Sequence, residues 1–236
     1  MPTRYFGLIP AAGSGARFGG GHPKQYTEIG GRTLLWLAVR ALLADVRIDT
    51  VFVVLAPGDT TYRRLDWSAF GDRIAPLYCG GATRAESVRS GLICASDAID
   101  LEDWVLVHDA ARPCLAQPDL TRLVDTVSAD EVGGILAVPL ADTLKRADAG
   151  ERVAATEPRE GLWRAQTPQM FRLGTLLRAL DAARDVTDEA AAVEALGLRP
   201  KLVAGSAGNI KVTYPEDVAI AAAFLEQGGH SGARQR

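Results

Sequence analysis

The residues best suited to chemistry lie in one early segment, between Ile9 and Tyr26. Small residues dominate its first half, namely Ala11, Ala12, Gly13 and Gly15. Their backbone N–H groups can approach phosphate oxygens, because no bulky side chain blocks them and glycine tolerates a positive φ. Arg17 can grip two phosphate oxygens at once, and Lys24 adds a mobile point charge. The segment is therefore predicted to hold a triphosphate.

Two better-known glycine loops do not fit this spacing. A P-loop requires Gly-Lys-Ser/Thr, whereas Lys24 follows Pro23 and precedes Gln25. The dinucleotide fingerprint requires a further glycine where the chain has Phe18. A flexible loop with two solvated cations is the remaining alternative, and it is the less favoured one.

Short apolar runs alternate with helical patterns along the chain. The expected strands are Tyr5–Ile9, Thr50–Leu55, Ile74–Tyr78, Trp104–His108 and Gly134–Pro139. Such runs are typical of strands that are buried on both faces. Apolar residues recur at helical spacing over 33–44, which predicts a helix packed against the sheet. The alternation predicts an α/β fold, with a Rossmann-like, mostly parallel sheet and helices on both faces.

Later segments indicate where helices begin and where the domain ends. Thr83 with Glu86, and Thr213 with Glu216, match the capping box at a helix start. After Glu226 the composition turns to Gly, Ser, Arg and Gln, which indicates a frayed tail. We expect a single domain over 1–228 and a flexible tail over 229–236. Trp104 and Trp163 are expected in the core, and His108 is expected to be a partly buried structural residue rather than a base. The final helix is expected to turn Val218, Ala221, Ala222 and Leu225 inward.

The region from Ala141 to Arg159 is polar and is interrupted by Gly150 and Pro158. Two β-prone pieces within it predict a projecting hairpin, which we call the β-arm, over 140–160. From the residues alone, a solvated surface loop is an equal alternative, since loops of this length are usually functional or disordered.

Composition excludes several classes of protein. The chain has 236 residues, of which 47% are hydrophobic and 23% charged, so disorder and coiled coil are not expected. A formal charge of -3 argues against a nucleic-acid partner. Cys79, Cys94 and Cys114 lack the spacing of a zinc site or disulfide framework. No apolar stretch reaches the roughly 18 residues of a membrane span, so we expect a cytoplasmic protein.

A set of motifs resembles the 2-C-methyl-D-erythritol 4-phosphate cytidylyltransferase family, over about Phe6 to Leu225. The motifs are Ile9–Tyr26, Gly80–Val88, Val107–Pro113, Asp142–Arg146, Gly161–Trp163 with Thr167–Gln169, Thr187–Ala190 and Asn209–Thr213. The resemblance implies transfer of a cytidylyl group from CTP to a polyol phosphate, in a homodimer whose subunits exchange the β-arm.

The same resemblance implies roles for individual residues. Arg17 and Lys24 match residues that stabilise the triphosphate, while Lys211 and the partner subunit's Arg159 match residues that grip the acceptor phosphate. Gly80, Gly81 and Ser87 match positions that read cytosine. Ala82 stands where family members often have aspartate, which makes cytosine preference less secure. Further substrate-binding positions are Arg84, Arg112, Thr143, Thr167 and Thr187.

Asp109 is the residue expected beside a metal ion, because it follows an apolar strand at the end where such sheets bind ligands. Magnesium is the expected ion, since it often takes one or two carboxylates alongside substrate phosphates. The alternative is an aspartate that only bonds Arg112, three residues on.

Three other functions are weighed against this one. The first is a cytidylyltransferase for ribitol 5-phosphate, which shares the N-terminal motif. The second is a sugar-phosphate nucleotidyltransferase that uses UTP or GTP, which the absence of a second domain disfavours. The third is a non-catalytic nucleotide-binding protein, which would be expected to lose Lys24 or Lys211, and both are present.

Overall fold

The central sheet of the computed structural model has seven strands in the order β11-β7-β10-β6-β1-β4-β5. The structure describes residues 3–15, 18, 23–183 and 186–231. Every neighbouring pair is parallel except the two that involve β10, which runs antiparallel to β6 and β7. The strands are β1 (Tyr5–Pro10), β4 (Ile48–Val54), β5 (Ile74–Leu77), β6 (Trp104–Val107), β7 (Gly134–Pro139), β10 (Trp163–Arg172) and β11 (Lys201–Ala204). The predicted mostly parallel α/β sheet is confirmed.

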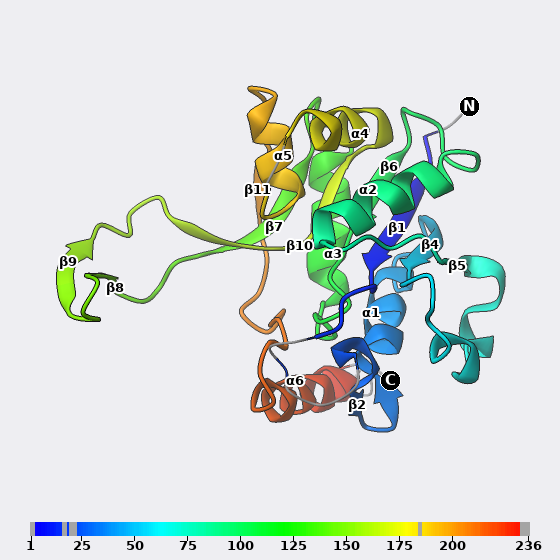
Figure 1. The fold of residues 1–236 in the computed structure, drawn as a ribbon, viewed down its shortest axis with the longest axis horizontal. Coiled ribbons are helices and arrows are strands. Elements are labelled where there is room, and N and C mark those ends of the chain that lie inside the picture. Colours follow the sequence, from blue (N-terminus) through cyan, green and yellow to red (C-terminus); the bar gives the residue numbers. More distant parts are fainter. Residues whose placement is uncertain (1–2, 16–17, 19–22, 184–185, 232–236) are drawn as a thin grey trace.

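Helices cover both faces of this sheet, as predicted (Figure 1). One face packs against α1 (Leu34–Leu43) and α3 (Gln117–Val127). The other packs against α2 (Arg84–Ala95), α4 (Leu173–Ala182) and α5 (Glu189–Ala195). Side chains alternate between the two faces along each strand, so Leu8 and Ile9 of β1 lie in different core clusters.

The capping box predicted at Thr83 is confirmed, whereas the one at Thr213 is wrong. Thr83 accepts a hydrogen bond from Glu86 N, and Glu86 bonds back to the Thr83 backbone. The final helix, α6 (Asp217–Ser231), begins later than predicted. Its first residue, Asp217, accepts hydrogen bonds from the backbone N–H groups of Thr213 and Tyr214, at 2.7 and 2.9 Å. Asp217, rather than Glu216, therefore satisfies the backbone N–H groups just before the helix.

Helix α6 turns its apolar residues inward, in agreement with the sequence prediction. Ala221 is buried, with Val218, Ala222 and Leu225 packed around the same small cluster. The helix runs to Ser231, so it continues past Glu226 and into the segment predicted as a tail.

The chain between β7 and β10 forms a projecting arm, which extends away from the sheet in Figure 1. Its tip is an antiparallel hairpin of β8 (Leu144–Ala147) and β9 (Val153–Glu157). Trp163, at the base of the arm, is 38% exposed, so its predicted place in the core is wrong, while Trp104 is buried at 1%. The remaining elements are the pair β2 (Glu28–Ile29) and β3 (Arg32–Thr33), and the 3-10 helices η2 (Lys24–Tyr26), η3 (Tyr62–Arg64) and η4 (Ser68–Arg73).

Within the described ranges, no helix combines the length and apolar character needed to cross a membrane.

Candidate active site

A cavity of about 240 Å³ lies at the carboxyl ends of β1 and β6. Loops that follow parallel strands meet at this edge, which is where open α/β sheets bind ligands. Two lysines and one arginine converge on the cavity together with one carboxylate, that of Asp109. Among the described residues, its lining is Pro10, Ala11, Ala12, Gly13, Gly15, Lys24, Gln25, Gly81, Ala82, Thr83, Arg84, Ser87, Asp109, Ala110, Ala111 and Lys211.

The glycine loop after β1 is packed closely against the chain that carries Lys24. Gly15 has φ 72°, and a Cβ added there would lie 2.8 Å from Lys24 N. Gln25 donates to the carbonyl of Ala11 at 2.6 Å, which ties the two ends of the loop together. Lys24 Nζ donates to Val212 O at 2.7 Å, next to Lys211. Glycine at this position therefore allows the loop to lie directly against the backbone of Lys24.

The loop before α2 closes the opposite side of the cavity. Gly80 approaches the first loop so closely that an added Cβ would lie 2.2 Å from the Cβ of Ala12. Gly81 N donates to Ser87 Oγ at 3.1 Å, and Ala82 N donates to a carboxylate oxygen of Glu86 at 2.7 Å. These bonds fix the loop against the start of α2.

Asp109 lies at the centre of a charged cluster. Its Oδ1 accepts from Arg84 Nε at 2.9 Å, and its Oδ2 lies 2.7 Å from Lys211 Nζ. Arg112 Nε is further away, 3.9 Å from Oδ2, so Arg112 is not the main partner. Burial alone raises the pKa of Asp109, but Arg84 and Lys211 outweigh burial and hold that pKa well below its ordinary value. Asp109 is therefore ionised at neutral pH.

Arg84 also binds a second carboxylate, that of Glu189. Its two terminal nitrogens donate to Glu189 at 2.6 and 3.0 Å, in a bidentate pair. Burial disfavours the charge on Arg84, but Glu189 and Asp109 outweigh burial and raise its pKa above the ordinary value.

His108 and Thr167 support Asp109 from behind the cavity. His108 Nε2 donates to Arg112 O at 3.0 Å, which leaves Nδ1 to accept from the Thr167 hydroxyl at 3.0 Å. Thr167 Oγ1 in turn accepts from Asp109 N at 3.0 Å. Burial lowers the pKa of His108 to about 4. His108 is thus neutral and fully buried, whereas the sequence predicted a partly buried structural residue.

Most of the predicted site residues that the structure describes line the cavity. They are Ala11, Ala12, Gly13, Gly15, Lys24, Gly81, Ala82, Arg84, Ser87, Asp109 and Lys211.

Of the other predicted residues that the structure describes, Gly80 packs against Ala12 without lining the cavity, and the rest lie elsewhere. Thr167 is buried behind Asp109, and Arg112 donates to Asn209 O at 2.6 Å beside it. Thr187 is exposed just before α5. Thr143 and Arg159 are on the arm, outside the lining. Arg17 lies outside the described residues.

Two residues with clear positions in the site were missed from the sequence. Gln25 lines the cavity, and its position directly after Lys24 is the sequence feature that could have indicated this. Glu189 lies within the motif Thr187–Ala190, but a glutamate that opens a helix is more often a solvated first-turn residue than the buried partner of an arginine.

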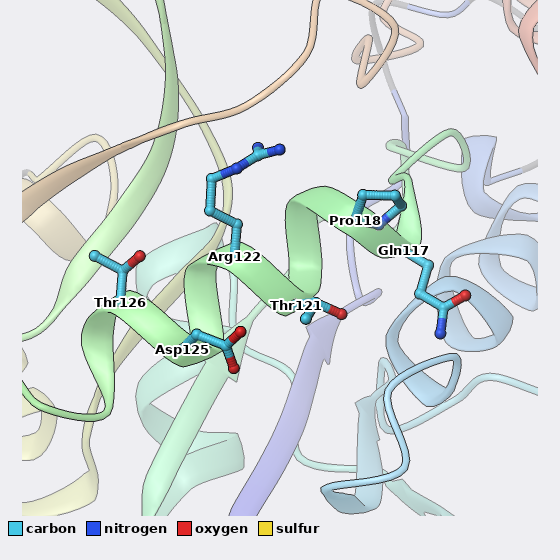
Figure 2. Close-up of a pocket in the computed structure, with 6 residues that line it drawn as sticks. All are labelled: Gln117, Pro118, Thr121, Arg122, Asp125 and Thr126. Atoms are coloured by element: carbon cyan, nitrogen blue, oxygen red, sulfur yellow. The ribbon is translucent and has the colours of Figure 1, made fainter.

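A second hollow, of about 450 Å³, lies along α3 (Figure 2). Its lining is Gln117, Pro118, Thr121, Arg122, Asp125 and Thr126, which includes none of the predicted site residues. In the part of the chain that the structure describes, no group of three or more His, Cys, Asp or Glu side chains is arranged to hold a metal ion.

Comparison with known sequences agrees with the motifs. Residues 6–227 match the family model for IspD, 2-C-methyl-D-erythritol 4-phosphate cytidylyltransferase. The chain is 58% identical over 225 residues to the enzyme of that name from Dechloromonas aromatica, covering 95% of this chain and 98% of the relative. It is 56% identical over 218 residues to the one from an Azoarcus species, covering 92% of each.

Solved structures agree with both the fold and the family. A crystal structure of 4-diphosphocytidyl-2C-methyl-D-erythritol synthase has a TM-score of 0.85 at 43% identity, covering 95% of this chain and 100% of that one. The 2-C-methyl-D-erythritol 4-phosphate cytidylyltransferase of Thermus thermophilus has a TM-score of 0.77 at 32% identity, covering 95% and 100%. The chain belongs to the 2-C-methyl-D-erythritol 4-phosphate cytidylyltransferase family.

Proposed function

We propose that the cavity described above binds CTP and the polyol phosphate side by side and that its cations carry the chemistry. The reaction itself follows from the family: CTP and 2-C-methyl-D-erythritol 4-phosphate give 4-diphosphocytidyl-2-C-methyl-D-erythritol and pyrophosphate, in isoprenoid biosynthesis. An oxygen of the acceptor phosphate attacks the α-phosphorus of CTP, and pyrophosphate leaves in line. Both reactants are anions, so positioning and charge neutralisation should dominate catalysis.

CTP is proposed to lie between the two loops. The small residues Ala11 to Gly15 leave backbone room for phosphate oxygens, and Lys24 lies in the same lining. Arg17 is proposed to join Lys24 in stabilising the charge that develops at the α-phosphate. The base is proposed to meet the loop of Gly80, Gly81 and Ala82, near Ser87.

The acceptor phosphate is proposed to bind at Lys211, whose side chain is 41% exposed while its partner Asp109 is 9% exposed. Lys211 can therefore turn from the carboxylate to a phosphate. Arg112, Thr167 and Thr187 would complete or support this side of the site. No general base is required, because the phosphate has a second pKa of about 6 and is largely ionised near neutral pH.

A homodimer is proposed to complete the acceptor site. Thr143 and Arg159 are exposed on the arm and do not line the cavity of their own chain. The shape of the arm supports a role in reaching a second subunit (Figure 1). No nucleic-acid or membrane partner is proposed, and the proposed compartment is the cytoplasm.

Magnesium is proposed to enter with CTP, with Asp109 as its protein ligand. A carboxylate offers about four lone-pair positions, and the two hydrogen-bonded cations leave some of them open. One carboxylate beside a triphosphate suits magnesium, which would neutralise phosphate charge when bound.

The observation that carries the proposal is the convergence of Lys24, Arg84 and Lys211 on one cavity beside an ionised Asp109. The test is pyrophosphate release with CTP and magnesium, offering 2-C-methyl-D-erythritol 4-phosphate, ribitol 5-phosphate or no acceptor in parallel, and then UTP or ATP in place of CTP. We expect release only with CTP and the methylerythritol phosphate. Pyrophosphate release with ribitol 5-phosphate instead would change the assigned acceptor. No release with any pair of nucleotide and acceptor would contradict catalysis.

A further inference from the structure

Glu189 is a buried carboxylate that the reaction as described does not use. It is the first residue of α5, is 1% exposed and does not line the cavity. Its two oxygens accept hydrogen bonds from the two terminal nitrogens of Arg84, at 2.6 and 3.0 Å. The third nitrogen of that guanidinium, Nε, donates to Asp109 Oδ1 at 2.9 Å. Arg84 is thus a rigid bridge between a carboxylate outside the cavity and one inside it.

The start of α5 is itself fixed by Gln169. This side chain is 1% exposed, donates to Asp188 Oδ2 at 2.9 Å and accepts from Ala190 N at 2.8 Å. It therefore grips the residues on both sides of Glu189. Gln169 is also paired across the sheet with Val107, two residues before Asp109. The same pair of strands thus locates Glu189 and Asp109 relative to each other.

The charge balance of the cluster gives this arrangement a consequence for the site. Arg84, Arg112 and Lys211 surround Asp109, and Glu189 is the second carboxylate within the described part of the cluster. Without Glu189, Arg84 would lose the bidentate contact that sets the plane of its guanidinium, and only its Nε would still be held, by Asp109. The contact at Asp109 Oδ1 would then loosen, and the position of Lys211 on Oδ2 would loosen with it.

An ion pair with a purely structural role would not need the additional hydrogen bond from Arg84 to Asp109. Buried ion pairs contribute little net stability compared with packed apolar residues. Here Arg84, which Glu189 holds, lines the cavity and donates to Asp109. Asp109 in turn forms an ion pair with Lys211.

We infer that Glu189 is a positioning residue for cytidylyl transfer, which holds Arg84 so that Asp109 and Lys211 are aligned in the cavity. This inference rests on the proposed roles of Asp109 and Lys211. A misplacement of about 1 Å can cost on the order of a hundredfold in rate. The loss of one anchor of Arg84 should therefore be measurable in turnover.

The test is a double-mutant cycle on kcat/KM for 2-C-methyl-D-erythritol 4-phosphate, using wild type, Glu189→Gln, Arg84→Ala and the double variant. Glu189→Gln should lower kcat/KM by about tenfold or more, and the double variant should be no worse than Arg84→Ala alone. Glu194→Gln, an exposed glutamate on the same helix, is the matched control and should behave as wild type. Independent losses that multiply in the double variant, or a Glu189→Gln enzyme with wild-type kcat/KM, would overturn the inference.

Arg84→Lys covers the case in which Glu189→Gln does not fold. Lysine keeps the charge but cannot bridge both carboxylates with a planar fork, so the same loss is expected. Wild-type kcat/KM for Arg84→Lys would overturn the inference. Inactivity of the wild type in this assay would refute the proposed function and the inference with it, whereas an active wild type with an unaffected Glu189→Gln variant would refute the positioning role alone.

Discussion

Lys211 and Asp109 form an ion pair in which Lys211 Nζ lies 2.7 Å from Asp109 Oδ2. The lysine side chain is 41% exposed, whereas the aspartate side chain is 9% exposed. The second oxygen of the carboxylate is held from the inner side by Arg84. A substrate phosphate that binds Lys211 therefore competes with a carboxylate already in place. The competition should limit anion binding in the absence of substrate.

Asp109→Asn tests this competition directly. Removing one negative charge beside Lys211 should tighten metal-free binding of 2-C-methyl-D-erythritol 4-phosphate by about tenfold, as a modest Coulomb gain in a partly screened site. Turnover should nevertheless fall, because the proposed magnesium ligand is lost. Calorimetric titration with 2-C-methyl-D-erythritol 4-phosphate and steady-state kinetics measure the two effects, and Asp125→Asn on the outer surface of α3 is the control. Unchanged affinity for this phosphate would contradict the competition.

Lys24→Ala should lower kcat much more than it raises the KM for CTP. The proposed role of Lys24 is to stabilise charge that develops in the transition state, and such a role appears mainly in kcat. Arg17→Ala is expected to behave in the same way. Steady-state kinetics at saturating acceptor measure both constants, with Lys201→Ala on β11 as a control for loss of a half-exposed lysine. A change confined to KM would refute the role.

Gly15→Ala should reduce kcat/KM for CTP by more than tenfold while the fold is retained. The backbone has φ 72°, and the new Cβ would lie 2.8 Å from Lys24 N, so the loop and Lys24 must shift. The matched control is Gly58→Ala, where an added Cβ meets nothing within 4 Å. Equal activity of the two variants, with equal thermal midpoints, would contradict the need for this close approach.

The sequence predicted the strands β1, β4, β5, β6 and β7 because their apolar runs are local patterns, but it did not predict β10, which is largely polar, or β11, which has four residues. Short apolar runs form the strands, and loops that leave parallel strands at one edge bring the segments around Gly13, Gly81 and Asp109 together. Strand boundaries differ from the predictions by a residue or two, as hydrogen bonding at strand ends is not encoded in apolar character.

Predictions that depend on distant partners succeeded less often. Thr213 and Glu216 match a capping box, but Asp217 accepts from the Thr213 N–H that Glu216 would otherwise bind, and also from Tyr214 N. Trp163 resembles a core residue by type, yet its position where β10 enters the arm leaves it 38% exposed. The role of Glu189 depends on Arg84, 105 residues away, and no local spacing indicates that pairing.

Mixing two inactive variants should restore activity if the arm supplies Arg159 to the neighbouring subunit. Arg159→Ala and Lys211→Ala homodimers would each lack one proposed phosphate contact at both sites. A heterodimer would contain one site with both contacts intact, so up to about half of the wild-type activity per heterodimer is expected. Differently tagged subunits can be co-expressed, purified through both tags and assayed for pyrophosphate release. An inactive mixture in which heterodimers are shown to form would exclude the exchanged arm.

The neutral, buried His108 should make folding stability depend on pH. Burial lowers its pKa from 6.5 to about 4 in the folded chain, whereas the unfolded chain keeps the ordinary value. Between these values the unfolded state binds more protons, so the free energy of unfolding should fall as pH falls from about 6.5 to about 4, by about 3 kcal/mol in total. Above a pH of about 6.5, His108 is neutral in both the folded and the unfolded state, so stability is not reduced.

His108→Gln should remove that part of the pH dependence. Glutamine is neutral across the range and retains a donor and an acceptor for the Arg112 carbonyl and the Thr167 hydroxyl. Urea unfolding of wild type and variant at intervals between pH 4 and pH 7 measures the difference, which cancels contributions from groups that both proteins share. Parallel pH profiles for the two proteins would show that His108 is able to accept a proton in the folded state, contrary to its complete burial beside Arg112 and Thr167.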